Sequence, residues 1–179
     1  MGDARKLSEC GDGRFFLVVF SFNGIDSVAH ADRTAILSEI YRVLAPGGFC
    51  WFSTHNLDGP VRHPHRFSMP TIRLTLNPLR LAYRLALFTK LLIQNANNRR
   101  RFRVFDEHAD DYCMINTGAH DHGLMIHHIR ITEQQRQLRE LGFEDNCVAF
   151  SSLDGQRVEA TTDTSSIGWF HLVARKPSA

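Results

Sequence analysis

The sequence lacks most of the patterns that would assign it to a specialised class of protein. Its four cysteines (Cys10, Cys50, Cys113 and Cys147) lie far apart and form no C-x-x-C pair, so neither a disulfide framework nor a zinc site is expected. No apolar run is long enough to cross a bilayer, and no signal peptide is expected. The formal net charge is only +2, which indicates no particular partner for the chain as a whole. We therefore expect a cytoplasmic protein with reduced cysteines.

What is present is ordinary for a globular domain. The chain has 179 residues, of which 43% are hydrophobic and 22% are charged. A chain of this length can bury a sizeable core within one domain. The clues to function must therefore come from local patterns.

The first third of the chain alternates between strand and helix patterns. The apolar run Phe15–Phe20 is typical of a strand that is buried on both faces in a parallel sheet. From about Asp32, which is placed to cap a helix, apolar residues recur at helical spacing. These residues are Ile36, Leu37, Ile40, Val43 and Leu44. Pro46 and Gly47–Gly48 end the helix, the glycines by adopting backbone angles closed to other residues, and Phe49–Ser53 predicts a second strand. This order predicts a βαβ unit with parallel strands.

Polar residues follow both predicted strands. Ser21-Phe22-Asn23 comes directly after the first strand, and Thr54-His55-Asn56 comes after the second. In open α/β sheets, ligands bind beyond the carboxyl ends of the strands. We therefore expect both segments to lie at a binding site.

These segments resemble the second half of the class I S-adenosylmethionine-dependent methyltransferase domain. The matching pieces are Gly2-Asp3-Ala4 with Leu7, the strand Phe15–Phe20, the R-V-L-x-P-G-G run Arg42–Gly48, the helix Leu138–Phe143 and the closing strand Phe170–Lys176. The resemblance implies an α/β fold. Its core would be a partial Rossmann-like methyltransferase sheet, with strands matching the fourth to the seventh, helices, and a basic helical insert.

The resemblance also implies S-adenosylmethionine as the cofactor. In the family, an Asp at the position of Asp3 contacts the adenine amino group, and the backbone of Ala4 helps. The loop residues Ser21, Phe22 and Asn23 are expected at the same site. The family's glycine-rich loop has no counterpart here, because Gly11-Asp12-Gly13 precedes a strand instead of following one. We therefore expect an N-terminally truncated methyltransferase with weak cofactor binding and little independent activity, or alternatively a non-catalytic methyltransferase-like subunit or interaction module.

Histidine and asparagine side chains are the candidates for a catalytic role. Methyl transfer is mainly a matter of positioning, and a base is needed only if the acceptor must lose a proton. His55 and Asn56 are the first candidates, and His30 or His122 are weaker ones. The clusters at 120–122 and 127–128 lack the spacing of a known metal motif, so no metal is expected. The acceptor is expected to be a small molecule rather than nucleic acid.

The middle of the chain is basic, and it separates two parts of the expected domain. Residues 58–105 contain ten Arg or Lys residues and only one acid, Asp58. A helix is predicted from Pro78, ending at Asn95–Asn98. This segment is interpreted either as a lid or substrate face, or as a solvated helix end; contact with a membrane surface is a further alternative, without insertion. The predicted division is 1–56 for a partial cofactor-binding βαβ half, 57–130 for the insert, and 131–179 for the C-terminal helix and strand pair.

Two further expectations concern the remaining segments. A strand is predicted at 127–131, and the capping box Thr132–Gln135 is predicted to open the following helix. In the family, a first strand pairs with the strand that matches Phe15–Phe20. Because that strand has no counterpart here, Phe15–Phe20 is expected to be a bare edge that causes self-association or recruits an N-terminal partner.

Overall fold

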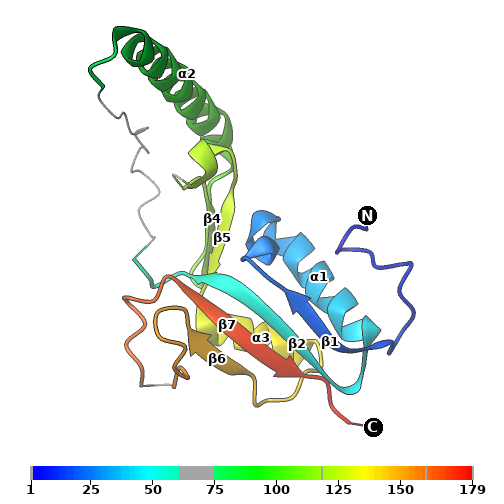
Figure 1. Ribbon diagram of the computed structural model, residues 1–179. Helices are drawn as coiled ribbons and strands as arrows, with labels where there is room; N and C mark the ends of the chain where they lie inside the picture. The colour runs from blue at the N-terminus through cyan, green and yellow to red at the C-terminus, as the bar shows by residue number, and fades with distance from the viewer. Residues whose placement is uncertain (1, 61–74, 118, 160, 179) are drawn as a thin grey trace.

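The computed structural model describes residues 2–60, 75–117, 119–159 and 161–178, and its core is a seven-stranded sheet (Figure 1). The strands are β1 (Phe15–Phe20), β2 (Leu44–Asn56), β3 (Glu107–His108), β4 (Tyr112–Ile115), β5 (Ile126–Ile129), β6 (Val148–Ser151) and β7 (Trp169–Arg175). The α-helices are α1 (His30–Val43), α2 (Pro78–Phe102) and α3 (Ile131–Glu140). Short 3-10 helices are η1 (Gly24–Ser27), η2 (Arg103–Phe105) and η3 (Ala119–His122).

The predicted βαβ unit is confirmed, with β2 at the centre of the sheet. β1 runs parallel to β2, so that Val18 lies opposite Cys50 and Phe20 opposite Phe52. β7 pairs antiparallel with β2, and β6 pairs antiparallel with β7. The predicted closing strand and the helix before the last strand pair are therefore also confirmed. Further along β2, β5 pairs in parallel with His55 and Asn56 and brings β4 and β3 into the sheet.

Helices cover one face of the sheet formed by β1, β2, β7 and β6. The apolar stripe of α1 packs with Leu138 of α3 against alternate strand residues such as Phe52 and Leu172, all of them buried. Residues at the intervening strand positions face the other side, because successive side chains alternate between the faces. Among these, Val19 is 51% exposed and Trp51 is 46% exposed. We call this side the open face.

The prediction that β1 is buried on both faces is therefore wrong. Four of its six residues (Phe15, Phe16, Leu17 and Val19) are exposed, and within the described residues β1 pairs with β2 alone. An apolar run predicts burial only when elements are present to cover both sides. Here α1 covers one side, and no described helix covers the other.

The Pro-Gly-Gly run lies inside β2, because α1 already ends at Val43 and the strand begins before the predicted Phe49; the run depends on two different properties of glycine. Gly47 has φ +77, which is a conformation that L side chains rarely adopt. Gly48 is instead needed for space, because a Cβ there would lie 2.9 Å from the carbonyl oxygen of Ala45 and 3.0 Å from that of Phe16. The expectation of unusual backbone angles thus holds for Gly47 only.

The segment after β2 forms an arm made of α2, η2, β3, β4, η3 and β5. Pro78 opens α2 as predicted, and the Asn77 side chain caps it by accepting a hydrogen bond from the Arg80 backbone N–H at 3.1 Å. The helix continues through Asn95–Asn98 to Phe102, so the predicted end is wrong. The predicted strand at 127–131 corresponds to β5. Because β3, β4 and β5 belong to the sheet, the range 57–130 is not simply a helical insert; the domain division itself stays a prediction.

Two predicted helix caps are wrong. α1 begins at His30 with Ala29 as its N-cap, and Asp32 lies in the first turn, where it pairs with Arg5 at 3.1 Å. α3 begins at Ile131 with Arg130 as its N-cap, and no capping side chain bonds its first turn. In both cases the chain enters the helix earlier than the capping residue suggests.

The cysteines are free, as predicted. Cys50, Cys113 and Cys147 are buried, and Cys10 is partly buried. Burial raises the pKa of the Cys50 thiol and that of the Cys147 thiol to about 12 each. These two groups are therefore uncharged core residues and not nucleophiles.

Candidate functional site

The loop after β1 is held in an unusual backbone conformation. Phe22 has φ 57 and Asn23 has φ 51, and such values are uncommon for residues other than glycine. The ring of Phe22 is fully in solvent, with 97% of the residue exposed. Asn23 is anchored, because its backbone N–H donates to the Ser53 hydroxyl at 2.8 Å. Strained residues of this kind cluster at functional sites.

A pocket of about 370 Å³ opens beside this loop at the carboxyl ends of β1 and β2. It is lined by Ser21, Phe22, Asn23, Ser53, Trp169 and His171. Two aromatic side chains and several hydrogen-bonding groups therefore face one space. This volume and composition are typical of a small-molecule site.

A buried carboxylate lies behind the pocket. Asp26, in η1, is fully buried and accepts hydrogen bonds from the Thr54 hydroxyl at 2.7 Å and the His55 backbone N–H at 2.7 Å. It also forms an ion pair with the buried guanidinium of Arg33. Burial alone would raise the pKa of the Asp26 carboxyl, but Arg33 and the hydrogen bond from His55 bring it below its ordinary value. Asp26 is therefore an anion.

The Asp26 carboxylate fixes the orientation of the His55 ring. His55 Nδ1 lies 2.8 Å from Asp26 Oδ2, and because this acceptor is ionised, Nδ1 carries a proton that it donates. In the neutral ring the other nitrogen, Nε2, is then an acceptor, and it lies 3.3 Å from Asn23 Nδ2. The arrangement can take up a proton at Nε2, with the carboxylate stabilising the resulting imidazolium.

Arg33 ties this site to the helix layer. Its guanidinium donates to the Thr54 hydroxyl at 2.8 Å and to the side-chain oxygen of Gln134 in α3. A buried guanidinium needs such partners, because an unpaired buried charge is very unfavourable. α1, η1, β2 and α3 therefore meet in one hydrogen-bonded network beneath His55.

A second cluster of aromatic rings joins the arm to the same network. His30 Nδ1 lies 2.9 Å from His127 Nε2, and the His30 ring stacks on Tyr112 with centroids 3.7 Å apart. His128 lies beside His55, with ring centroids 5.2 Å apart. Burial, together with the nearby charge of Arg33, lowers the pKa of His127 to about 3. Burial, together with the neighbouring His55, lowers the pKa of His128 to about 4. Both are therefore neutral near pH 7.

The structure places the predicted catalytic candidates in different settings. His55 is not itself a lining residue of the pocket, but its Nε2 lies 3.3 Å from the amide nitrogen of Asn23, which does line the pocket. Asn56 does not face the open side: it is buried, and its amide nitrogen donates to the carbonyls of Thr164 at 2.8 Å and Ile167 at 2.9 Å. This corrects the expected orientation, because β2 alternates its side chains and Asn56 points opposite to His55. His122 is buried against Asn116, and His30 belongs to the stacked cluster.

The predicted cofactor-binding residues fall into two groups. Ser21, Phe22 and Asn23 line the pocket together. Asp3 is not among the lining residues: both of its carboxylate oxygens accept from Arg5, which lowers the pKa of the Asp3 carboxyl to about 2. Ala4 packs against the edge of the core.

Sequence reasoning missed four residues that shape the site, namely Asp26, Arg33, Trp169 and His171. Asp26 lies in a loop without any pattern, and Arg33 reads as an exposed helix residue. Trp169 and His171 come from a strand more than a hundred residues later in the chain. The consecutive rings Trp169, Phe170 and His171 at the start of β7 do not show in the sequence which strand they will pair with.

Two kinds of feature are absent from the described residues. In these parts of the chain, no group of three or more His, Cys, Asp or Glu side chains could hold a metal ion. Nor do the described residues contain a helix long and apolar enough to cross a membrane.

Solved structures share this architecture. A SAM-dependent methyltransferase from Methanosarcina mazei matches 99% of the chain with a TM-score of 0.51 at 17% identity. Methyltransferases from Thermotoga maritima and Mesorhizobium loti each match 98% of the chain, with TM-scores of 0.51 and 0.52 at 12% and 16% identity. The chain has a class I methyltransferase-like fold.

The match covers nearly all of this chain but only part of each of those proteins. The chain spans 66%, 61% and 68% of those three proteins, respectively. No protein-family model matches the sequence, and no curated protein matches it. The resemblance matches β1, β2, β7 and β6 to the fourth, fifth, seventh and sixth strands of the methyltransferase sheet, and these four strands are neighbours in this order here.

The pocket of this methyltransferase-like fold suits part of S-adenosylmethionine. The side-chain oxygen of Asn23 is buried without a hydrogen-bond partner among the described residues, so it is available to a ligand donor. The exposed ring of Phe22 offers a flat apolar surface or a π face for a cation. Asp3 fits less well, because it would have to release Arg5. Ser21, Phe22 and Asn23 are thus the residues that would hold the group.

Proposed function

We propose that this chain provides the acceptor-side half of an S-adenosylmethionine-dependent methyltransferase acting on a small molecule in the cytoplasm. The observation that carries the proposal is the Asp26–His55 pair at the carboxyl ends of β1 and β2, beside the pocket lined by Phe22 and Trp169. The fold supports methyl transfer, and the pocket's volume of about 370 Å³ suits a small acceptor.

His55 is the group that would accept a proton from the acceptor. S-adenosylmethionine, when bound, supplies an electrophilic methyl group. An acceptor hydroxyl, thiol or ammonium that gains this methyl must lose a proton, and His55 Nε2 can take it. Asp26 acts as a positioning residue, because it holds the proton on Nδ1 and stabilises the imidazolium. For this transfer the Asn23 amide must give up its 3.3 Å contact with Nε2, after which it can orient the acceptor.

Cofactor binding by this chain alone is proposed to be weak. Asn23 and Phe22 offer contacts for one part of the cofactor, and the described residues contain no glycine-rich loop following a strand. Each missing charge-assisted hydrogen bond removes about 1.5–3 kcal/mol, so several of them lower the affinity by orders of magnitude. Titration calorimetry tests this, and low-micromolar binding by the monomer would contradict it.

An activity screen tests the role of His55. The chain would be assayed at one high, fixed concentration of S-adenosylmethionine against small hydroxyl, thiol and amine compounds, with S-adenosylhomocysteine formation as the readout. We expect His55→Gln to abolish turnover and Asp26→Asn to shift the pH profile, whereas Cys50→Ser should leave turnover unchanged. Equal rates for His55→Gln and the unmodified chain would remove His55 from the mechanism.

A non-catalytic subunit is the second candidate function, and one observation favours it. β1 presents a free edge of apolar residues with neither charge nor proline, and unpaired strand edges recruit other chains. We propose self-association, or pairing with an N-terminal partner, along this edge. Size-exclusion chromatography with light scattering over a range of concentrations tests it. A monomer at every concentration, with slowly exchanging amides in Phe15–Phe20, would show that the edge is already covered.

A further inference from the structure

The helix α2 stands apart from the rest of the molecule. It has 25 residues and extends away from the sheet, with its N-terminal end furthest from the strands (Figure 1). Its main contacts with other described elements are with η2 and η3, which lie near its C-terminal end. The N-terminal part therefore needs an explanation other than packing against the sheet.

α2 exposes large apolar residues, and most of them lie on one side; Leu85, which is 48% exposed, lies outside it. Leu79 is 82% exposed, Tyr83 70%, Leu87 41% and Ile93 56%. At 3.6 residues per turn these four lie within an arc of roughly 120°. We call them the apolar arc. A contiguous exposed apolar surface of this kind marks an interaction site.

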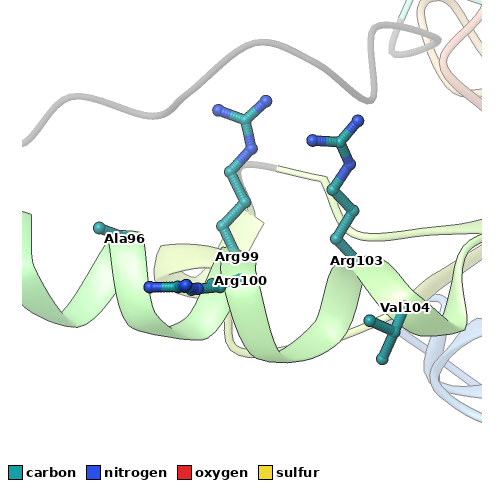
Figure 2. A pocket seen from close by; sticks show the side chains of 5 residues that line it. All are labelled: Ala96, Arg99, Arg100, Arg103 and Val104. Atoms are coloured by element: carbon teal, nitrogen blue, oxygen red, sulfur yellow. The ribbon is translucent and has the colours of Figure 1, made fainter.

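Positive charge accompanies the apolar arc, and α2 itself carries no acidic residue. Residues 78–105 contain no Asp or Glu, and α2 carries Arg80, Arg84, Lys90 and Arg99–Arg101. Near the C-terminal end, Ala96, Arg99, Arg100, Arg103 and Val104 line a hollow of about 520 Å³. Figure 2 shows Arg99 and Arg103 pointing to the same side of the helix, with Arg100 extending in another direction. At about 100° per residue, Arg99 and Arg103 lie on the side of α2 away from the apolar arc, whereas Arg80 and Arg100 flank it.

We propose that α2 is an interfacial anchor that lies on an anionic lipid bilayer. The apolar arc would enter the boundary of the acyl chains, and the flanking residues Arg80 and Arg100 would contact lipid phosphates. The arc spans only part of the helix, and α2 is not apolar enough to cross a membrane. An amphipathic helix with cations and no acids is complementary to such a surface in both apolarity and charge.

Lys90 distinguishes a bilayer from other partners. It lies within the apolar arc, between Leu87 and Ile93, and it is exposed. A protein groove that took the apolar arc would bury its ammonium, which is unfavourable. At a bilayer the long stem can extend to the phosphate level while the neighbouring leucine is buried. Nucleic acid would use the cations but would leave Leu79, Tyr83 and Ile93 in water.

Vesicle sedimentation with the full chain tests the proposal. The probes are sucrose-loaded vesicles of equal parts phosphatidylcholine and phosphatidylglycerol, and vesicles of phosphatidylcholine alone. We expect binding to the anionic vesicles that is at least about tenfold stronger than to the neutral ones, and that weakens as salt is added. Hydrogen exchange at 79–93 should slow when anionic vesicles are present.

Matched variants distinguish binding through the apolar arc from nonspecific adsorption to the vesicles. Leu79→Gln combined with Tyr83→Gln should reduce vesicle binding by about tenfold or more. The control Leu153→Gln changes a leucine that is 65% exposed on a distant loop, and it should have no effect. Arg100→Gln with Arg101→Gln should reduce both the binding and its salt dependence, whereas Arg157→Gln should not. An unchanged circular dichroism spectrum would confirm that these surface substitutions preserve the helix. If one of the variants loses helix content, Ile93→Gln is used in its place.

Several outcomes would overturn the proposal. These are the absence of sedimentation with anionic vesicles, equal sedimentation with neutral vesicles, and equal loss in the Leu153→Gln control. Displacement from vesicles by RNA, with the apolar-arc variant binding RNA normally, would assign the surface to nucleic acid. Oligomers that dissociate in the apolar-arc variant, without any vesicle binding, would assign it to contact between copies of the chain.

Discussion

The two faces of β2 differ sharply although both are apolar. On one face Phe52 is 1% exposed and packs beneath α1 and α3; on the other face its neighbour Trp51 is 46% exposed. The sequence FCWFS therefore encodes two surfaces with different roles. The covered face supplies the stability of the isolated chain, and the open face is available to another molecule.

The largest expected effect comes from removing a ring on the covered face. Phe52→Ala should lower the free energy of unfolding by about 4 kcal/mol, because it deletes buried apolar volume and leaves a cavity. Trp51→Ala on the open face should cost less than about 1 kcal/mol in the monomer. Urea unfolding at low protein concentration measures both. A similar loss for the two variants would mean that the open face is covered in solution.

A slightly smaller effect is expected from the buried ion pair beneath the pocket. Asp26→Asn leaves the fully buried Arg33 without its counter-charge, and we expect a loss of about 3 kcal/mol. The matched control is Arg136→Gln, which removes a half-exposed guanidinium from its pairs with the partly buried Glu133 and the exposed Glu140 and should cost less than about 1 kcal/mol. A neutral result for Asp26→Asn would show that Arg33 finds another partner.

Acid should destabilise the junction between the arm and the sheet. His127 and His128 have pKa values of about 3 and about 4 in the folded chain and an ordinary value near 6.5 when unfolded. Because the folded values are lower, the unfolded chain binds protons first. Stability is therefore complete above pH 6.5 and falls as the pH approaches 4, by on the order of 2 kcal/mol per histidine at pH 5.

The variant His127→Phe tests this assignment, since it keeps a ring that can stack but removes one of the two imidazoles that take up a proton on unfolding. The loss of unfolding free energy between pH 7 and pH 5 should shrink by about half. An unchanged pH profile, measured by urea unfolding at each pH, would show that other groups control the acid transition.

The smallest effect on stability, and the clearest effect on association, is expected at the edge strand. Leu17 is 55% exposed, so Leu17→Lys should change the free energy of unfolding by less than about 0.5 kcal/mol. A lysine on an edge strand opposes pairing with another chain. Light scattering should then show a shift towards monomer, with Leu153→Lys as the control. Association that persists in Leu17→Lys would place the contact elsewhere.

The sequence predicted those parts of the fold that local patterns determine. The bounds of β1 and the stripe of α1 follow from hydrophobic period, and the positive φ at Gly47 follows from backbone sterics. The predicted helix starts were less accurate. Asp32 and Thr132 have side chains that can cap a helix, but tertiary contacts can engage such side chains instead. Asp32 instead pairs with Arg5.

The site was only partly predictable, because its chemistry depends on contacts between distant segments. The place of His55 at the end of β2 followed from topology. Its partner Asp26 did not, since nothing in the sequence indicates which loop carboxylate folds back to the strand end. The burial of Asn56 also depends on a distant loop, whose carbonyls at Thr164 and Ile167 accept its amide protons.

The stacked rings of His30, Tyr112 and His127 connect the arm to the site. β5 carries both His127, bonded to the first residue of α1, and His128, adjacent to the His55 ring. Any displacement of β5 against β2 must therefore separate His128 from His55, and displacement against α1 must break the bond between His30 and His127. The arm and the imidazole beside the pocket are therefore joined by direct ring contacts through β5, and the geometry of each depends on where this short strand lies.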